Sequence, residues 1–279
     1  MHRALPALLL GGSLFFLPAC SGGWRNLAEP AGPRYAGCCV APPGAIDTLR
    51  VVTFNIKFAQ EIDRAIRLFR DTPELRSPDI VFLQEMDERG VSKLARALAL
   101  NYVYYPAAIN LGKGRLFGNA VLARWPIEND RKILLPHGAR LSGLRRIAVR
   151  ATVNVNGQSL RLYSLHFATA FELGGDALRD QALAVLEDVQ EDDEPAILAG
   201  DLNSLGLQKV LAEGGLACAT GGLGPTTYLF SLDHIYLKGL ERCPTAAAGV
   251  IAENYGASDH SPVWALVEMP RDFRSSAAP

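Results

Sequence analysis

The chain has 279 residues, of which 49% are hydrophobic and 20% charged, a composition typical of a globular protein and too apolar for a disordered one. Lysine and arginine number 28 and aspartate and glutamate 29, so the net charge is -1. This balance excludes a protein whose whole surface is basic for nucleic acid, but it is compatible with a local basic groove.

The first residues are typical of an export signal. Met1 to Arg3 form a basic head, and no charged residue follows until after Trp24. The apolar stretch ends in Leu17-Pro18-Ala19-Cys20, which resembles a bacterial lipobox, where the cysteine becomes acylated after cleavage. We therefore predict a signal peptide over residues 1–19 and a lipid on Cys20. Ordinary cleavage and an uncleaved anchor are the alternatives.

These alternatives all place the protein outside the cytoplasm. Ser21 lacks the aspartate that signals inner-membrane retention in many Gram-negative bacteria. In such a host we expect a lipoprotein of the cell envelope, on the outer membrane and facing the periplasm or the exterior. Residues 20–48 are rich in Gly, Pro and Ala, so we expect a lipidated cysteine followed by a flexible tether. Residues 269–279 are expected to form a disordered tail.

Residues 49–268 alternate between strand and helix patterns, which predicts one α/β domain. In chain order we expect a strand over 50–56, a helix over 61–69, a strand over 79–84, a helix over 92–100 and a strand over 119–123. Asn156-Gly157 then lies between two alternating segments, over 147–155 and 159–165, and is the strongest short-range signal for a hairpin.

A helix over 176–189, a buried strand over 195–200 and strands over 232–237 and 261–267 complete the predicted domain. An antiparallel hairpin is thus mixed with strand–helix units. We therefore expect an α/β (α+β) fold with mixed sheets covered by helices, and not a doubly wound parallel sheet.

Polar side chains collect at the ends of these predicted strands. They comprise four carboxylates, two asparagines and two histidines: Asn55, Glu85, His166, Asp201, Asn203, Asp233, Asp259 and His260. Strand ends meet at one edge of a sheet, so residues far apart in sequence can converge there. Carboxylate and amide oxygens suit Mg²⁺ or Mn²⁺. A divalent ion beside His and Asp is what phosphodiester cleavage needs, because the ion neutralises phosphate charge while a carboxylate orients water.

Seven short blocks carry a resemblance to a known family. In order they are Thr53-Phe54-Asn55-Ile56, Leu83-Gln84-Glu85, Gly118-Asn119-Ala120-Val121-Leu122, Ser164-Leu165-His166, Gly200-Asp201-Leu202-Asn203-Ser204, Leu232-Asp233-His234-Ile235 and Ser258-Asp259-His260-Ser261-Pro262-Val263. Together they resemble the endonuclease/exonuclease/phosphatase superfamily, which includes deoxyribonuclease I, apurinic endonucleases, neutral sphingomyelinases and inositol-polyphosphate 5-phosphatases. The resemblance covers residues 49–268. It implies a four-layer α/β/β/α sandwich of two mixed sheets and Mg²⁺-dependent phosphoester hydrolysis, with Mn²⁺ as the alternative ion.

The resemblance also implies a role for each matching residue. Glu85 resembles the principal metal ligand, with Asn55 beside it, and Asp259 would complete this metal site or a second, weaker one. Asp201 would orient or deprotonate the attacking water, and Asn203 would help to hold that water and the phosphate.

The remaining matches concern the phosphate. His260 would contact the scissile phosphate while Asp233 fixes its ring, and His166 would face the phosphate from the other side and assist the leaving group. Asn119 would support the site, and Arg146, or its neighbour Arg145, matches a basic position that would touch phosphate. Taken alone, each residue has an ordinary structural use, such as a cap or a turn. The order of all seven blocks favours the functional interpretation.

Several substrate classes are compatible with this sequence. Between residues 111 and 161 there are ten basic residues and two acidic ones, which favours a nuclease acting on DNA or RNA. A solvated outer face of arginines would give the same count. The predicted lipid anchor favours a phospholipid or inositol-phosphate phosphoesterase, and a non-catalytic binding module is the third alternative. As partners we expect a phosphoester substrate, either nucleic acid or a phospholipid head group, and a membrane that is contacted through the N-terminal lipid. We expect the protein to be a monomer.

Cys218 and Cys243 are the only cysteines in the predicted catalytic domain. Since export implies an oxidising compartment, we predict that they form a disulfide around the segment that holds Asp233. Two free thiols are the alternative, because sequence spacing does not show whether the two residues come within bridging distance.

Overall fold

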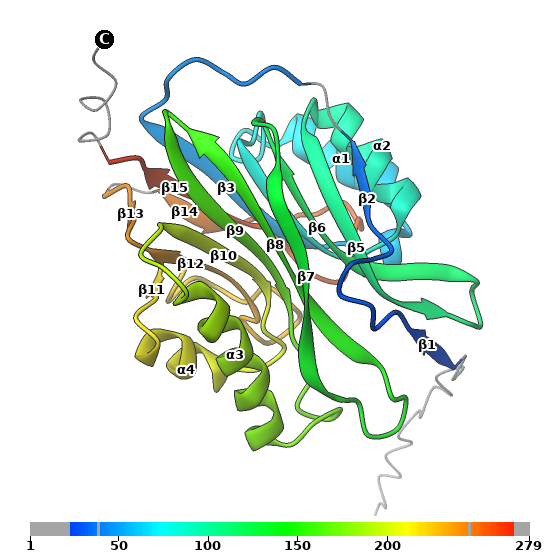
Figure 1. Cartoon of the computed structure of the whole chain (residues 1–279). Coiled ribbons are helices and arrows are strands. Elements are labelled where there is room, and N and C mark those ends of the chain that lie inside the picture. Colours follow the sequence, from blue (N-terminus) through cyan, green and yellow to red (C-terminus); the bar gives the residue numbers. More distant parts are fainter. Residues whose placement is uncertain (1–22, 38–39, 245–246, 271–279) are drawn as a thin grey trace, which may run out of the picture.

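The computed structural model describes residues 23–37, 40–244 and 247–270, and Figure 1 shows two β-sheets stacked face to face with helices outside them. The predicted signal peptide, Cys20 and the end of the predicted tail from residue 271 lie outside the described residues. Within the described ranges, no helix has the length and apolar character needed to cross a membrane.

The first sheet contains nine strands. Its strand order is β1-β5-β6-β4-β3-β15-β13, with β14 paired to β15 and β2 paired to β5. The strands are β1 (Trp24–Asn26), β2 (Tyr35–Gly37), β3 (Thr48–Asn55), β4 (Ile80–Met86), β5 (Asn101–Asn110), β6 (Arg115–Ala123), β13 (Glu241–Arg242), β14 (Ala248–Val250) and β15 (Val263–Glu268). Strands β3 and β4 are parallel whereas β4 and β6 are antiparallel, so the sheet is mixed, as expected.

The second sheet contains six strands in the order β11-β12-β10-β9-β8-β7. The strands are β7 (Glu128–Gly138), β8 (Arg145–Val155), β9 (Gln158–His166), β10 (Ala196–Asp201), β11 (Ala217–Cys218) and β12 (Asp233–Lys238). The predicted hairpin is confirmed, because β8 and β9 are antiparallel and both turn residues, Asn156 and Gly157, have positive φ. Strands β9 and β10 are parallel, which makes this sheet mixed as well.

Helices cover the outer face of each sheet. They are α1 (Ile62–Asp71) and α2 (Glu88–Leu98) on the first sheet, and α3 (Gly175–Val189) and α4 (Leu207–Glu213) on the second, with a short 3₁₀ turn η1 (Lys57–Ala59) after β3. One apolar cluster fills the space between the two sheets. A second lies between the first sheet and its helices, and a third lies between the second sheet and its helices. This arrangement confirms the four-layer α/β/β/α sandwich.

The segment expected to be a flexible tether is largely ordered. Strands β1 and β2 both pair with β5, which makes them edge strands of the first sheet. Lys132 Nζ donates to the carbonyl oxygens of Leu27 and Gly32, at 2.6 and 2.7 Å, and Arg34 forms an ion pair with Asp130. The prediction over 20–48 was wrong for these residues, because distant partners order a segment whose own composition has no apolar periodicity.

The sequence did not predict β5 and β7, although both are long strands. Strand β5 contains Pro106 and strand β7 contains Pro136, and a proline within a segment normally argues against a strand interior. Helix α2 begins at Glu88, four residues before the predicted start, and Asp87 caps it by accepting a hydrogen bond from Gly90 N at 2.8 Å.

The predicted disulfide is absent, and both cysteines are free. Cys218 lies on β11, which pairs with β12 in the second sheet. Cys243 follows β13, and its backbone N–H donates to Leu266 O on β15 of the first sheet. The prediction failed because Cys218 lies in the second sheet whereas Cys243 lies beside the first, and sequence spacing carries no information about that placement.

Candidate active site

Both sheets bring polar residues to the same edge of the sandwich. In the first sheet the parallel strands β3 and β4 end together, with Asn55 in register with Gln84. In the second sheet Asp201 is in register with His166 on parallel β9 and with Asp233 on antiparallel β12. The expectation that strand ends would gather these residues is therefore correct.

Gly200 makes the close approach of β9 and β10 sterically feasible. Its φ is 152°, and a Cβ at this position would lie 1.9 Å from Leu165 O. Only glycine adopts this conformation without a clash. The glycine immediately before Asp201 thus places the Asp201 carboxylate beside the His166 ring.

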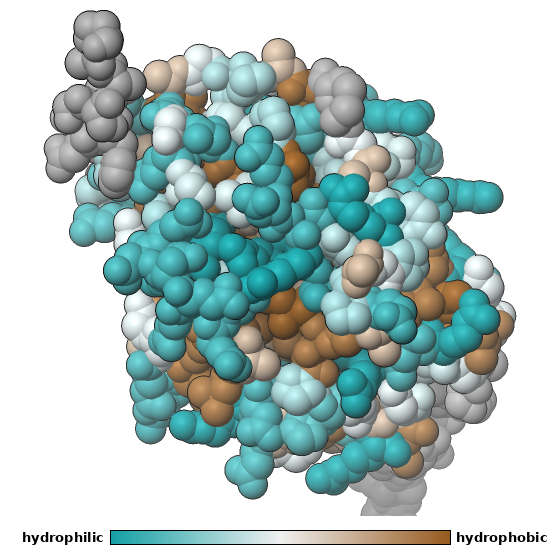
Figure 2. Space-filling model, in the orientation of Figure 1, coloured by the Kyte–Doolittle hydropathy of each residue, from teal (hydrophilic) through white to brown (hydrophobic). Residues whose placement is uncertain are grey.

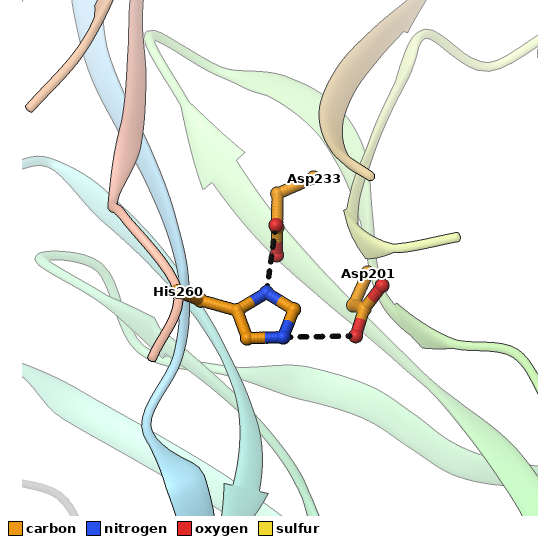
Figure 3. A group of neighbouring side chains, drawn as sticks. All are labelled: Asp201, Asp233 and His260. Carbon is orange, nitrogen blue, oxygen red and sulfur yellow. Dashed lines mark hydrogen bonds and ion pairs between the residues drawn. The ribbon is translucent and has the colours of Figure 1, made fainter. Parts of the chain in front are cut away.

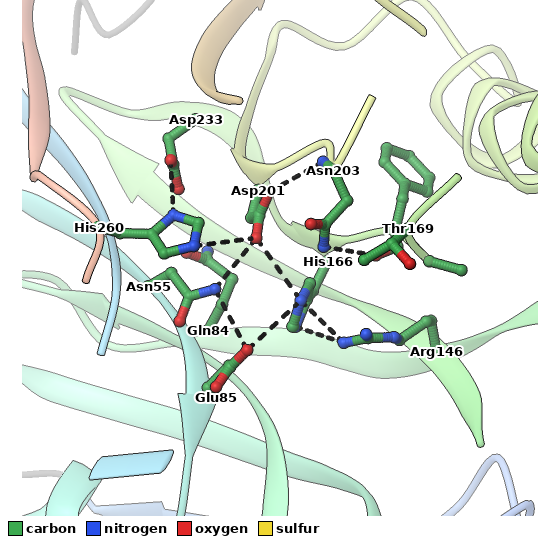
Figure 4. A network of polar contacts seen from close by, with 12 residues as sticks. Asn55, Gln84, Glu85, Arg146, His166, Thr169, Asp201, Asn203, Asp233 and His260 are labelled. Atoms are coloured by element: carbon green, nitrogen blue, oxygen red, sulfur yellow. Dashed lines mark hydrogen bonds and ion pairs between the residues drawn. The ribbon is translucent and has the colours of Figure 1, made fainter. Parts of the chain in front are cut away.

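Asp201 is the centre of the site (Figure 4). Its Oδ2 accepts a hydrogen bond from Asn55 Nδ2 at 3.0 Å and lies 3.7 Å from His166 Nε2 and 3.8 Å from His260 Nε2. The side chain is almost fully buried. Burial and then the neighbouring Asp233 raise the pKa of Asp201, and this suits a carboxylate that takes a proton near neutral pH.

His260 is held by Asp233 (Figure 3). Its Nδ1 donates to Asp233 Oδ2 over 2.8 Å, and the ring lies between Asp233 and Asp201. Burial alone would lower the pKa of His260, but the carboxylates of Asp233, Asp201 and Asp259 raise it to about 10. His260 is therefore an imidazolium at neutral pH, suited to stabilising negative charge on a phosphate.

Ser258 positions the chain around His260. Its Oγ donates to Asn55 O at 2.7 Å and accepts a hydrogen bond from His260 N at 3.2 Å. These contacts tie the loop before β15 to the end of β3. Ser258 belongs to the last of the seven sequence blocks, but no sequence pattern indicated this role.

His166 has the opposite protonation state from His260. Burial, followed by the nearby positive charges of Arg146 and His260, lowers the pKa of His166 well below its usual value. Arg146 Nη1 lies 2.8 Å from His166 Nε2, and a guanidinium has only donors, so the ring accepts and is neutral. The cation on this side of Asp201 is therefore Arg146.

Arg146 is itself held by a residue that the sequence did not reveal. Its Nη2 donates to both carboxylate oxygens of Glu172, at 3.1 and 2.9 Å. Glu172 lies in the loop between β9 and α3, outside every recognised block. A phosphate that approaches Arg146 would compete with this carboxylate.

Glu85 points into the site from a β-bulge. The register of β4 against β6 shifts between Leu83 and Met86, and Glu85 has a φ of 56°, which is uncommon for a residue other than glycine. Bulges beside active sites redirect side chains, and this one turns Glu85 towards Asn55 Nδ2, 3.5 Å away. Burial is the main cause that raises the pKa of Glu85, opposed by Arg146 and His260.

The oxygen donors fit the hard divalent ion expected from the sequence. Glu85 and Asn55 lie together, and the only polar contacts of the Glu85 carboxylate in the described chain are the long ones to Asn55 and to His166, at 3.5 and 4.0 Å. A carboxylate so weakly paired at a buried edge favours a cation. Asp259 lies at the exposed rim, where its Oδ2 is 3.0 Å from Lys57 Nζ.

The most compact group of ligand-type atoms is a different one. Asp201, Asp233 and His260 lie with one ligand atom each within 4.8 Å of one another. The hydrogen bond from His260 Nδ1 to Asp233 suits this trio to proton transfer and phosphate contact. Glu85 and Asn55 offer oxygen ligands for a hard divalent ion beside it.

Two predicted asparagines mainly support the site. Asn203 donates from its backbone N–H to Asp201 Oδ1 at 2.8 Å and from Nδ2 to Phe167 O at 3.0 Å. Asn119 is buried between the sheets, where its Nδ2 donates to Ile147 O and Ser164 O. Asn203 thus orients the Asp201 carboxylate, and Asn119 braces the strands that carry Arg146 and His166.

The comparisons with known proteins agree with this geometry. The model of the endonuclease/exonuclease/phosphatase family matches residues 52–260. An endonuclease/exonuclease/phosphatase from Beutenbergia cavernae DSM 12333 superposes with a TM-score of 0.65 and 22% identity, over 80% of this chain and 72% of that one. No protein with a curated description matches the chain.

Two further solved structures share the fold. A mannosyl-6-phosphatase from Bacteroides thetaiotaomicron VPI-5482 has a TM-score of 0.60 and 19% identity, over 79% of this chain and 98% of that one. TDP2 from D. rerio, in complex with a single-strand DNA product, has a TM-score of 0.60 and 17% identity, over 80% and 99%. These identities show the fold alone. The family model, however, spans most of the sequence, and the chain belongs to the endonuclease/exonuclease/phosphatase family.

Proposed function

We propose that the chain is an exported, Mg²⁺-dependent phosphodiester hydrolase. Phosphoester hydrolysis as such follows from membership of the family. One observation carries the finer proposal: a buried carboxylate, Asp201, lies between the His260 imidazolium and the pair formed by neutral His166 and Arg146, next to Glu85 and Asn55. Such an array can activate water and hold a phosphate at the same point.

The residues divide the chemistry among themselves. Asp201 accepts a proton from the attacking water as the water oxygen bonds to phosphorus and the bond to the leaving oxygen breaks. His260 and Arg146 hold the negative charge of the phosphate, and Asp233 keeps His260 protonated and oriented. Glu85 and Asn55, with Asp259 nearby, would hold Mg²⁺, which neutralises phosphate charge and stabilises the leaving oxygen when bound. Mn²⁺ suits the same ligands.

Nucleic acid is one candidate substrate, but the excess of basic residues between positions 111 and 161 supports it less strongly than their number suggests. Six of the ten basic residues form ion pairs within the described chain: Arg115, Arg124, Arg131, Arg146, Arg150 and Arg161. Lys132 instead donates to backbone carbonyls. The likeness to D. rerio TDP2 with its single-strand DNA product keeps nucleic acid among the substrates to be tested.

A panel assay tests the proposal. Plasmid DNA, RNA, sphingomyelin, inositol phosphates and soluble bis-p-nitrophenyl phosphate would be incubated with Mg²⁺, with EDTA as the control. Asp201→Asn should abolish turnover. Glu213→Gln on α4, whose carboxylate forms an exposed ion pair with Lys209, should leave turnover unchanged. Full activity in excess chelator would refute the metal-dependent mechanism.

Export and acylation are part of the proposal. The Leu17-Pro18-Ala19-Cys20 sequence supports a lipid on Cys20. The lipid would hold the protein in the cell envelope, on the outer membrane of a Gram-negative host. Mass spectrometry of the membrane fraction should detect the acyl mass, and Cys20→Ala should remove it. An unchanged mass in the variant would refute acylation.

A further inference from the structure

Exposed apolar side chains gather at the catalytic edge. In the described part of the chain nine large apolar or aromatic side chains are exposed: Leu111, Leu141, Phe171, Leu183, Leu205, Tyr228, Leu229, Phe230 and Tyr255. All except Leu183, which lies on α3, belong to connections at the strand ends that carry the catalytic residues. Single exposed apolar side chains are ordinary on a protein surface, but their concentration at one end of this molecule favours an interaction surface there.

Gly23 and strand β1 link two of these connections into one rim. Leu111, at the tip of the β5–β6 hairpin, donates from its backbone N–H to Gly23 O at 2.9 Å. Asn26 Nδ2 donates to Gly143 O at 2.8 Å in the β7–β8 hairpin, whose tip carries Leu141. Figure 1 shows both hairpins and β1 at the same end of the molecule, and Figure 2 shows apolar surface at that end.

The rim continues to Phe171 in the loop between β9 and α3. Arg140 N donates to Glu172 O at 3.1 Å, which joins this loop to the β7–β8 hairpin. Leu141 and Phe171 are almost fully exposed, on separate loops. Single protruding side chains of this kind do not form the flat, continuous patch that a protein partner would bury.

Basic residues flank the apolar tips. Arg25 on β1, Lys113 beside Leu111, and Arg140 and Arg145 beside Leu141 are exposed, and none of the four forms an ion pair with a carboxylate in the described ranges. Apolar tips with cationic flanks are the pattern of a surface that inserts into an anionic membrane interface, where each basic residue contributes attraction to lipid phosphates.

The rim lies close to the catalytic residues and to the start of the described chain. The Phe117 ring is 5.7 Å from the ring of His166 and 5.1 Å from that of Trp24 in β1. Cys20 precedes Gly23 by three residues.

We propose that this rim docks on an anionic lipid bilayer, with Leu111, Leu141 and Phe171 entering the interface and Arg25, Lys113, Arg140 and Arg145 contacting lipid phosphates. The active site then opens onto the membrane surface. This inference rests on the proposed phosphodiesterase function, for which it names the head-group phosphodiester of membrane lipids as the substrate class.

Bromolipid quenching tests the docked orientation. The full chain would be reconstituted in vesicles of phosphatidylcholine and phosphatidylglycerol with brominated acyl chains, as Phe171→Trp or as its matched control Leu183→Trp. Tryptophan at 171 should lose emission relative to the parent chain, whereas tryptophan at 183 should not. Equal quenching at both positions, or quenching at neither, would overturn the proposal.

Charge and substrate supply two further arms. In the Phe171→Trp chain, the triple change Lys113→Gln, Arg140→Gln and Arg145→Gln should abolish the quenching, and retained quenching would overturn the role of anionic lipid. Hydrolysis of vesicle head groups is expected, and cleavage of DNA without lipid hydrolysis would overturn the substrate class. Turnover of soluble bis-p-nitrophenyl phosphate tests the proposed function separately, since it requires no membrane.

Discussion

Asp233→Asn is the sharpest test of the assignment of His260 as a cation. The substitution keeps the size of a side chain that is fully buried, but it removes the charge that accepts the 2.8 Å hydrogen bond from His260 Nδ1. Burial then lowers the pKa of His260 with less opposition, so the pKa falls from about 10 towards or below the ordinary value of 6.5.

The size of the effect depends on pH. With a pKa of about 10 the ring stays protonated at pH 8, whereas at the ordinary value of 6.5 only about 3% remains protonated, so loss of the cation alone costs roughly thirtyfold in rate. At pH 6 most of the ring is protonated in both proteins, and the cost from titration nearly disappears. The raised pKa of His260 also stabilises the folded state. This contribution to stability is present in full below about pH 6.5 and is lost as the pH rises through about 10.

The assay is a pH profile of kcat/KM on bis-p-nitrophenyl phosphate, for both the parent chain and Asp233→Asn. In the variant, the alkaline limb of the profile should shift to lower pH by several units. Thermal unfolding of both proteins controls for loss of the fold. Identical alkaline limbs in two folded proteins would refute the assignment of His260 as the cation.

Three further predictions concern the metal, the phosphate and the backbone. Glu85→Gln should lose most turnover and all response to added Mg²⁺, but it should keep the melting temperature of the parent because Glu85 adds little to the core. The rate is measured at increasing Mg²⁺ concentrations, and a rate that still rises with Mg²⁺ in the variant would contradict this prediction. Glu172→Gln should lower KM severalfold at unchanged kcat, because the bidentate pair with Arg146 no longer competes with phosphate; a raised KM would show that Glu172 only orients Arg146. Gly200→Ala should destabilise the fold by roughly 3 kcal/mol or more in urea unfolding, because its Cβ would lie 1.9 Å from a backbone oxygen; stability equal to the parent's would exclude this.

The sequence by itself determined the strands that carry the site. The Asn156-Gly157 turn, the alternating segments beside it and the buried strand before Asp201 are local patterns, so they were visible without the fold. The same holds for the polar residues at strand ends and for the order of the blocks, which together pointed to the correct family and to the residues that gather around Asp201.

Only the tertiary structure decided how those residues and their surroundings are paired. Burial lowers the pKa of both His166 and His260, but the Arg146 guanidinium lowers that of His166 further, whereas the Asp233 carboxylate raises that of His260. Six of the ten basic residues between positions 111 and 161 pair with acids distant in sequence, as Arg131 does with Asp188.

The ends of the sheets depended on long-range contacts as well. Strand β1 is stabilised through its pairing with β5 and through the bonds of Asn26 to the β7–β8 hairpin, and the two free cysteines follow from the assignment of β11 and β13 to different sheets. Hydrophobic periodicity and turn residues act over a few neighbours and are written in the sequence. Burial, ion pairing and edge-strand pairing depend on which distant segments meet, and only the folded chain brings those segments together.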